Sequence, residues 1–112
     1  AILSDEIEFG GFCEMNNRNK QSNPGCEMYR AFLTLKTPEE VHAFLCDLCT
    51  QAELSAIEQR YEVARMLDAG MIYNDILTKT GASSATVSRV NRSLLNGTDA
   101  YDMVFRRLNQ AK

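Results

Sequence analysis

Apolar residues recur at helical spacing over most of the chain after residue 27, and no segment alternates polar and apolar positions as a strand would. Residues 41–49, VHAFLCDLC, are apolar almost all round. A helix without a polar face must be enclosed on every side. A single chain of 112 residues does this with difficulty, whereas an intertwined dimer does it readily. The pattern therefore predicts an all-α protein that forms an intertwined homodimer.

Capping signals predict where the helices begin and end. The sequences TPEE at 37–40 and TQAE at 50–53 each place a threonine three residues before a glutamate, and the first adds a proline at the first helical position. Both patterns predict a capping box at a helix start. The second helix should end at Gly70, since glycine readily adopts the left-handed conformation of a helix terminus. Its apolar stripe comprises Leu54, Ile57, Tyr61 and Ala64, widened by Val63 and Leu67.

The N-terminal part of the chain has a different composition. Residues 14–26, EMNNRNKQSNPGC, are polar, rich in asparagine and interrupted by a Pro-Gly pair. This composition is typical of a linker or an arm. We therefore predict an N-terminal arm over residues 1–26 and a single helical domain over residues 27–112.

A pair of short helices is predicted around Gly81. An apolar-periodic run from Tyr73 to Thr80 precedes this glycine, and Ser83 is placed to cap a second helix at about 84–95. Glycine adopts the positive φ of a tight interhelical turn without strain, and this spacing is that of a helix-turn-helix. The apolar residues expected to pack the two helices together are Ile76, Leu77, Val87, Val90 and Leu94.

The second helix of this pair has a polar and cationic outward face. At about 100° per residue, the face opposite its apolar residues carries Ala85, Ser88, Arg89 and Arg92. A helix that reads the DNA major groove needs a slim N-terminal end, hydroxyl groups for base edges and phosphates, and cations for the backbone. The positive end of its dipole, at residues 83–85, adds attraction for phosphate.

Two other interpretations of this motif remain open. It could be a helical hairpin whose small residues only permit close packing, or a module that binds a protein partner. The charge distribution favours DNA: residues 78–112 hold six basic and two acidic side chains, whereas residues 28–77 hold four basic and eight acidic ones. No nucleophile–base pair, carboxylate dyad or phosphate-binding loop is found, so we expect neither an enzyme nor a cofactor.

Four cysteines and one histidine raise the question of a metal site or a redox site. Cys46 and Cys49 form a C-x-x-C sequence, and His42 would share their helical stripe. A structural zinc site usually has four ligands, but Cys13 and Cys26 do not form a second compact pair. We therefore expect no metal and buried, reduced thiols in a helical core.

The chain contains no segment that approaches the roughly 20 apolar residues of a membrane span. Its start, AILSDEIEFGG, lacks the basic flank and long apolar block of a secretory signal. We therefore expect a cytoplasmic protein without a membrane partner.

Three stretches resemble Trp-repressor-like proteins of the YerC/YecD type: QRYEVARML at 59–67, TGASSATVSRVNRSL at 80–94 and NGTDAYDM at 96–103. The resemblance extends from residue 27 to about 106. It implies a homodimer of interlocked helical subunits, each with a helix-turn-helix that binds double-stranded DNA. The positions it matches to DNA-contacting residues are Asn74, Ser84, Ala85, Thr86 and Ser88.

More distantly, two of these stretches look like segments of the tryptophan repressor, whose corepressor-binding arginines match Arg60 and Arg89. The match ends at Val90, where the resemblance expects a glycine that leaves room for the ligand. The valine methyl groups would occupy that space, so we expect that tryptophan is not the effector and that both arginines lie at the surface or contact phosphate. Another corepressor stays an open question. The sequence thus predicts a sequence-specific transcriptional regulator, with repression as the expected mode.

Overall fold

Helices account for most of the residues described by the computed structural model, 23–111, and no strand occurs in this range. The prediction of an all-α fold is confirmed. The bounds are Glu27–Phe32 for α2, Pro38–Leu48 for α3, Gln51–Asp68 for α4, Tyr73–Thr80 for α5, Ser84–Asn96 for α6 and Ala100–Gln110 for α7. No helix within the described range combines the length and the apolar character needed to cross a membrane. The chain divides into two units between Leu48 and Cys49.

The first unit contributes α2 and α3, which bury none of their side chains. Phe32 and Phe44 meet edge to face with ring centroids 5.1 Å apart. The start of α3 is capped as predicted by Thr37, whose Oγ1 accepts from the Glu40 amide at 3.1 Å. The Glu40 carboxylate accepts from the amide of Lys36 at 2.8 Å, one residue earlier than a capping box requires. The helix expected to be enclosed is therefore largely uncovered within its own unit.

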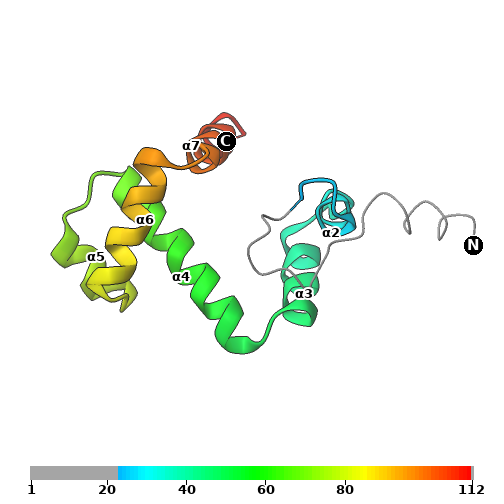
Figure 1. Ribbon diagram of the computed structural model, residues 1–112, viewed down its shortest axis with the longest axis horizontal. Helices are drawn as coiled ribbons and strands as arrows, with labels where there is room; N and C mark the ends of the chain where they lie inside the picture. Colours follow the sequence, from blue (N-terminus) through cyan, green and yellow to red (C-terminus); the bar gives the residue numbers. More distant parts are fainter. Residues whose placement is uncertain (1–22, 112) are drawn as a thin grey trace, which may run out of the picture. The chain divides into compact units, whose positions relative to one another are not determined.

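The second unit is built on α4, against which α5 and α6 pack, while α5 also contacts α6 (Figure 1). All five apolar residues expected to join α5 and α6 lie in or against the core of this unit. Ile57 does not, since its side chain is 41% exposed although the sequence pattern places it on the apolar stripe of α4. The buried core consists of Val63, Ala64, Ile76, Ala82, Val87, Val90 and Phe105.

Both ends of α4 form the caps predicted from the sequence. Thr50 Oγ1 accepts from the Glu53 amide at 3.1 Å, and the Glu53 carboxylate accepts from the Thr50 amide at 2.8 Å. At the other end Gly70 has a φ of +86°. The Met71 amide donates to the Met66 carbonyl at 3.1 Å, which is the long hydrogen bond of a Schellman motif. These local signals fix the length of α4, the helix against which α5 and α6 pack.

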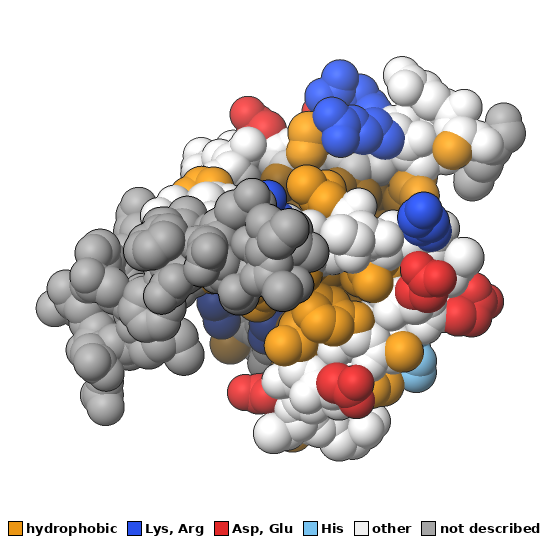
Figure 2. All heavy atoms as spheres, turned by 90° about the vertical axis from the view of Figure 1, so that its right-hand side faces the viewer, with side chains coloured by type: hydrophobic (Ala, Val, Ile, Leu, Met, Phe, Trp, Pro, Cys, Tyr) orange, Lys and Arg blue, Asp and Glu red, His pale blue; other side chains and the backbone are white. Residues whose placement is uncertain are grey.

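Helix α7 lies beyond the helices predicted from the sequence. It contacts α4 through Phe105, whose ring meets Tyr61 edge to face at 5.8 Å between centroids. The other large apolar side chains of α7, namely Met103, Val104 and Leu108, are 37%, 39% and 50% exposed. Figure 2 shows hydrophobic side chains at the surface of the molecule on the face it presents. The single chain therefore leaves apolar surface uncovered in both of its units.

Candidate nucleic-acid interface

A short turn of residues 81–83 joins α5 to α6, as predicted. Gly81 has a φ of +71°, and its amide donates to the Leu77 carbonyl at 3.0 Å. A Cβ atom at this position would meet no heavy atom within 4 Å, so the left-handed backbone conformation, not lack of space, requires the glycine. Ala82 then turns into the core, with 7% exposure. The turn is thus anchored at its centre.

Ser83 caps α6 and organises the N-terminal end of the helix. Its Oγ accepts from the Thr86 amide at 3.1 Å and lies 3.0 Å from Thr86 Oγ1. The first backbone hydrogen bond of the helix runs from Val87 to the Ser83 carbonyl at 3.1 Å. The amides of Ser84 and Ala85 precede that bond and stand at the positive end of the helix dipole, where an anion is favoured.

The side chains of α6 divide into an apolar face and a polar face. Val87 and Val90 are 0% and 2% exposed and lie in the core. Of the residues expected to contact DNA, all are exposed except Thr86, which is half-buried. The exposed residues are Asn74 on α5, Ser83 in the turn, and Ser84, Ala85, Ser88, Arg89 and Arg92 on α6. The structure therefore brings the hydroxyl groups and the cations together on the surface of a single helix.

Arg89 and Arg92 have no acidic partner in the described part of the chain. The ion pairs within residues 23–111 engage arginines of α2, α4 and α7 instead. On α4, Glu62 contacts Arg65 at 2.8 Å and raises the pKa of its guanidinium, first by hydrogen bonding and then by charge. Positive charge on α6 is thus left available for an external anion.

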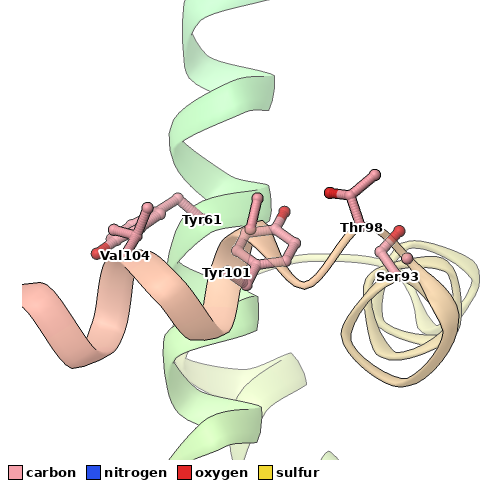
Figure 3. A pocket seen from close by; sticks show the side chains of 7 residues that line it. Tyr61, Ser93, Thr98, Tyr101 and Val104 are labelled. Atoms are coloured by element: carbon pink, nitrogen blue, oxygen red, sulfur yellow. The ribbon is translucent and has the colours of Figure 1, made fainter.

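The two arginines matched to a corepressor site do not share a described cavity. Arg60 is half-buried on α4 and Arg89 is exposed on α6. A cavity of about 450 Å³ lies between α4, the end of α6 and α7, and another of about 510 Å³ lies between α4 and the C-terminal part of α7. Neither is lined by either arginine. The lining of the first is Tyr61, Ser93, Gly97, Thr98, Ala100, Tyr101 and Val104 (Figure 3).

The thiols differ from their expected environment. Cys46 and Cys49 are free, but Cys46 is exposed and Cys49 is half-buried, so the expectation of buried thiols is wrong for both in the single chain. Cys46 Sγ lies 3.5 Å from His42 Nε2. Cys26 is buried but is not a free thiol, which corrects the expectation of a reduced one; Cys13 lies outside the described residues. No group of three or more potential metal ligands occurs in the described range.

Gln59 is a further residue of this region, and the sequence pattern did not single it out. Its Nε2 donates to the Thr80 carbonyl at 3.1 Å, which connects α4 to the end of α5. The sequence feature that could have pointed to Gln59 is its position: it is a polar residue one helical turn before Val63, on the stripe of α4 that faces the core. A donor on that stripe has to find an acceptor across the helix packing.

Comparisons with known proteins cover the whole of this region. The family model described as Trp repressor protein matches residues 26–109. The uncharacterized protein YerC of Bacillus subtilis is 46% identical over 86 residues, which are 77% of this chain and 83% of YerC. The solved structure of a TrpR like protein from Eubacterium eligens is 51% identical, with a TM-score of 0.72 over 74% of this chain and 86% of its own. A second solved structure, from Staphylococcus aureus, is 47% identical with a TM-score of 0.72, covering 74% and 83%.

Proposed function

Because the chain belongs to the Trp repressor family, we propose that it is a sequence-specific DNA-binding transcriptional regulator in which α5, the turn and α6 form a helix-turn-helix. The observation that carries the proposal is the division of α6 into a buried apolar face and an exposed face of small, hydroxyl and cationic side chains, whose arginines have no acidic partner within residues 23–111. A helix that only supports the fold has no need of unpaired arginines beside small residues. We propose that it represses transcription and that it acts in the cytoplasm.

The exposed face suggests a distribution of roles along α6. Ala85 and Thr86 lie near the N-terminal tip, where a recognition helix enters the major groove and reads base edges. Ser83, Ser84 and the first amides of the helix lie at the positive end of the dipole and suit a phosphate. Ser88 follows one turn later. Asn74, at the start of α5, suits a backbone contact from the supporting helix.

The cations occupy the later part of the same face. Arg89 and Arg92 lie one and two turns beyond the tip and have no acidic partner within residues 23–111. Side chains at that distance from the tip reach the DNA backbone more readily than the floor of the groove. We therefore assign both arginines to phosphates. A phosphate contact would also explain why an arginine stands at position 89 without requiring that it bind a corepressor.

We further propose that the protein acts as a homodimer. Leu33 is 85% exposed after α2, and Leu48 is 48% exposed at the end of α3, in addition to the apolar residues left open on α7. Large apolar side chains left exposed in each of the two units favour a protein interface. A second copy of the chain would cover it and would present two reading helices to half-sites about 34 Å apart.

Selection of bound sequences from a random duplex pool by the full chain tests the proposal. We expect enrichment of a sequence with two-fold symmetry, and an affinity that falls steeply with salt because phosphate contacts release counterions. A protein that enriches no duplex and binds random DNA without salt dependence would contradict the proposal and favour a protein-binding module. Repeating the selection with candidate metabolites tests whether an effector exists.

A further inference from the structure

One side chain of α4 reaches the last residue of α5, directly before the turn that connects α5 and α6. The hydrogen bond from Gln59 to the Thr80 carbonyl joins residues that are 21 apart in the sequence. The other hydrogen bonds that a side chain makes between two residues of the range 23–111 span four positions or fewer. Within the described part of the chain, this hydrogen bond is therefore the side-chain polar link between α4 and the pair formed by α5 and α6.

The acceptor of this bond has no alternative partner within its helix. Thr80 is the last residue of α5, and the carbonyls of the last helical turn lack intrahelical donors. The site is partly buried, so water reaches the carbonyl only in part, and an unsatisfied acceptor there would be unfavourable. The amide of Gln59 also meets the negative end of the α5 dipole. These conditions favour the observed geometry over a rotated side chain.

Thr80 transmits this anchoring across the turn. Its Oγ1 donates to the Ile76 carbonyl at 2.7 Å and accepts from the Ala82 amide at 3.1 Å. The residues on both sides of Gly81 are thus connected through one threonine. Since Ala82 leads directly into the Ser83 cap of α6, the position of Thr80 fixes where α6 begins.

Packing alone specifies this position less strictly than a hydrogen bond does. Val87 and Val90 hold α6 on α4, but the burial of apolar surface has no preferred direction. Base-edge hydrogen bonds need heavy-atom distances of about 2.7–3.2 Å, so a small displacement of α6 removes them. Attraction between arginines and phosphates falls off gradually with distance and tolerates the same displacement.

We infer that Gln59 is a positioning residue for sequence reading: it holds the α5–α6 turn on α4 so that the tip of α6 meets base edges in register. The inference rests on the proposed function. It predicts that loss of the amide donor lowers the affinity for a specific sequence and leaves general affinity for DNA nearly unchanged. A residue with a merely structural role would lower both in proportion to the unfolded fraction.

The test uses Gln59→Met, which keeps the length of the side chain and removes the donor. The matched control is Gln51→Met, the same substitution at an exposed position at the start of the same helix. Dissociation constants are measured for the full-length variants with the duplex recovered by selection and with a scrambled duplex of the same composition. We expect Gln59→Met to lower the affinity for the selected duplex about 5–10-fold, as the loss of one hydrogen bond with a stranded acceptor would. The affinity for the scrambled duplex should change less than about twofold, because its phosphate contacts remain.

Amide hydrogen exchange without DNA provides a second measurement. In Gln59→Met, the amides of Gly81 and Ala82 should exchange faster, while those of Val63 and Ala64 keep their wild-type protection. A folded Gln59→Met protein with the wild-type ratio of specific to scrambled affinity would overturn the inference. If the wild-type chain itself enriches no duplex, the proposed function fails instead, and the two failures are thus distinguishable.

Discussion

Helices α3 and α6 have similar lengths, 11 and 13 residues, but use their apolar residues in opposite ways. Helix α6 places Val87 and Val90 in the core of its own unit and leaves its polar face exposed. Helix α3 carries Phe44, Leu45 and Leu48 yet buries none of its side chains. The single chain therefore completes the packing of α6 but leaves the apolar side chains of α3 without full burial.

This contrast predicts that dimer formation and DNA binding depend on different helices. Substitution on the exposed face of α6 removes no core contact, so its effect should appear in DNA binding and not in folding. Substitution on α3 should act on the dimer, because a charge placed in an apolar interface is unfavourable unless it is paired. The two helices thus predict two classes of variant with different measurable defects.

The largest effect is expected from Leu48→Asp at the end of α3. Wild-type protein should sediment as a dimer at low micromolar concentration. The variant would place a carboxylate in the proposed interface, and we expect the dissociation constant of its dimer to rise at least about a hundredfold. Sedimentation equilibrium measures the mass of both proteins, and circular dichroism reports whether helical content falls with dissociation.

The control for this experiment is Ser88→Asp. Ser88 is an exposed polar residue of α6 and is not among the apolar side chains proposed to form the interface, so an added carboxylate there should leave the dimer intact. A wild-type chain that sediments as a folded, stable monomer would contradict the intertwined arrangement directly. Equal dissociation of both variants would show that any added charge weakens the dimer, and the contrast between α3 and α6 would disappear.

A smaller effect, confined to sequence reading, is expected from Ala85→Leu. Ala85 is exposed in the first turn of α6, where a large side chain would prevent close approach to the groove floor. We expect affinity for the selected duplex to fall roughly tenfold or more and affinity for random duplex to change little. Fluorescence anisotropy with both duplexes measures this, with Ala111→Leu as an exposed control. Equal losses on both duplexes would place Ala85 away from the base edges.

Arg92→Ala should have a still smaller effect that does not depend on sequence. The substitution removes one phosphate contact, so affinity should fall similarly on all duplexes and the slope of log affinity against log salt should shrink by about one unit. Arg65→Ala is the matched control, since Glu62 already pairs with Arg65 at 2.8 Å. If Arg92→Ala leaves affinity unchanged at low salt while the protein stays folded, the proposed reading face is wrong.

The sequence alone predicted those parts of the fold that depend on nearby residues. The capping box at Thr50, the left-handed conformation of Gly70 and Gly81, and the Ser83 cap each follow from residues within one helical turn. The inward residues of α5 and α6 were also predicted, because helical periodicity fixes which side chains share a face. The exposed face of α6 follows by the same argument.

Features that depend on tertiary contacts could not be predicted in this way. The contact of Gln59 with Thr80 requires knowing which carbonyl lies across the helix packing. Ile57 matches the apolar stripe of α4 but remains 41% exposed, since periodicity does not say which neighbour covers a face. Helix α7 was missed although Tyr101, Phe105 and Leu108 have helical spacing, and the exposure of Cys46 was likewise not apparent from its apolar neighbours.

The smallest expected effect, none at all, concerns tryptophan, and it depends on the same core packing that distinguishes α6 from α3. Val90 is 2% exposed and belongs to the core, at the position where the resemblance to the tryptophan repressor expects a glycine. If that resemblance holds at this position, its two methyl groups would occupy the space that a glycine leaves for an indole ring, and displacing them would disrupt the close packing of the core. Calorimetric titration of the full chain with L-tryptophan should therefore show no binding in the micromolar range. A clear micromolar isotherm would contradict this prediction. It would mean that Val90 moves aside and that the bound ligand supplies part of the packing around α6.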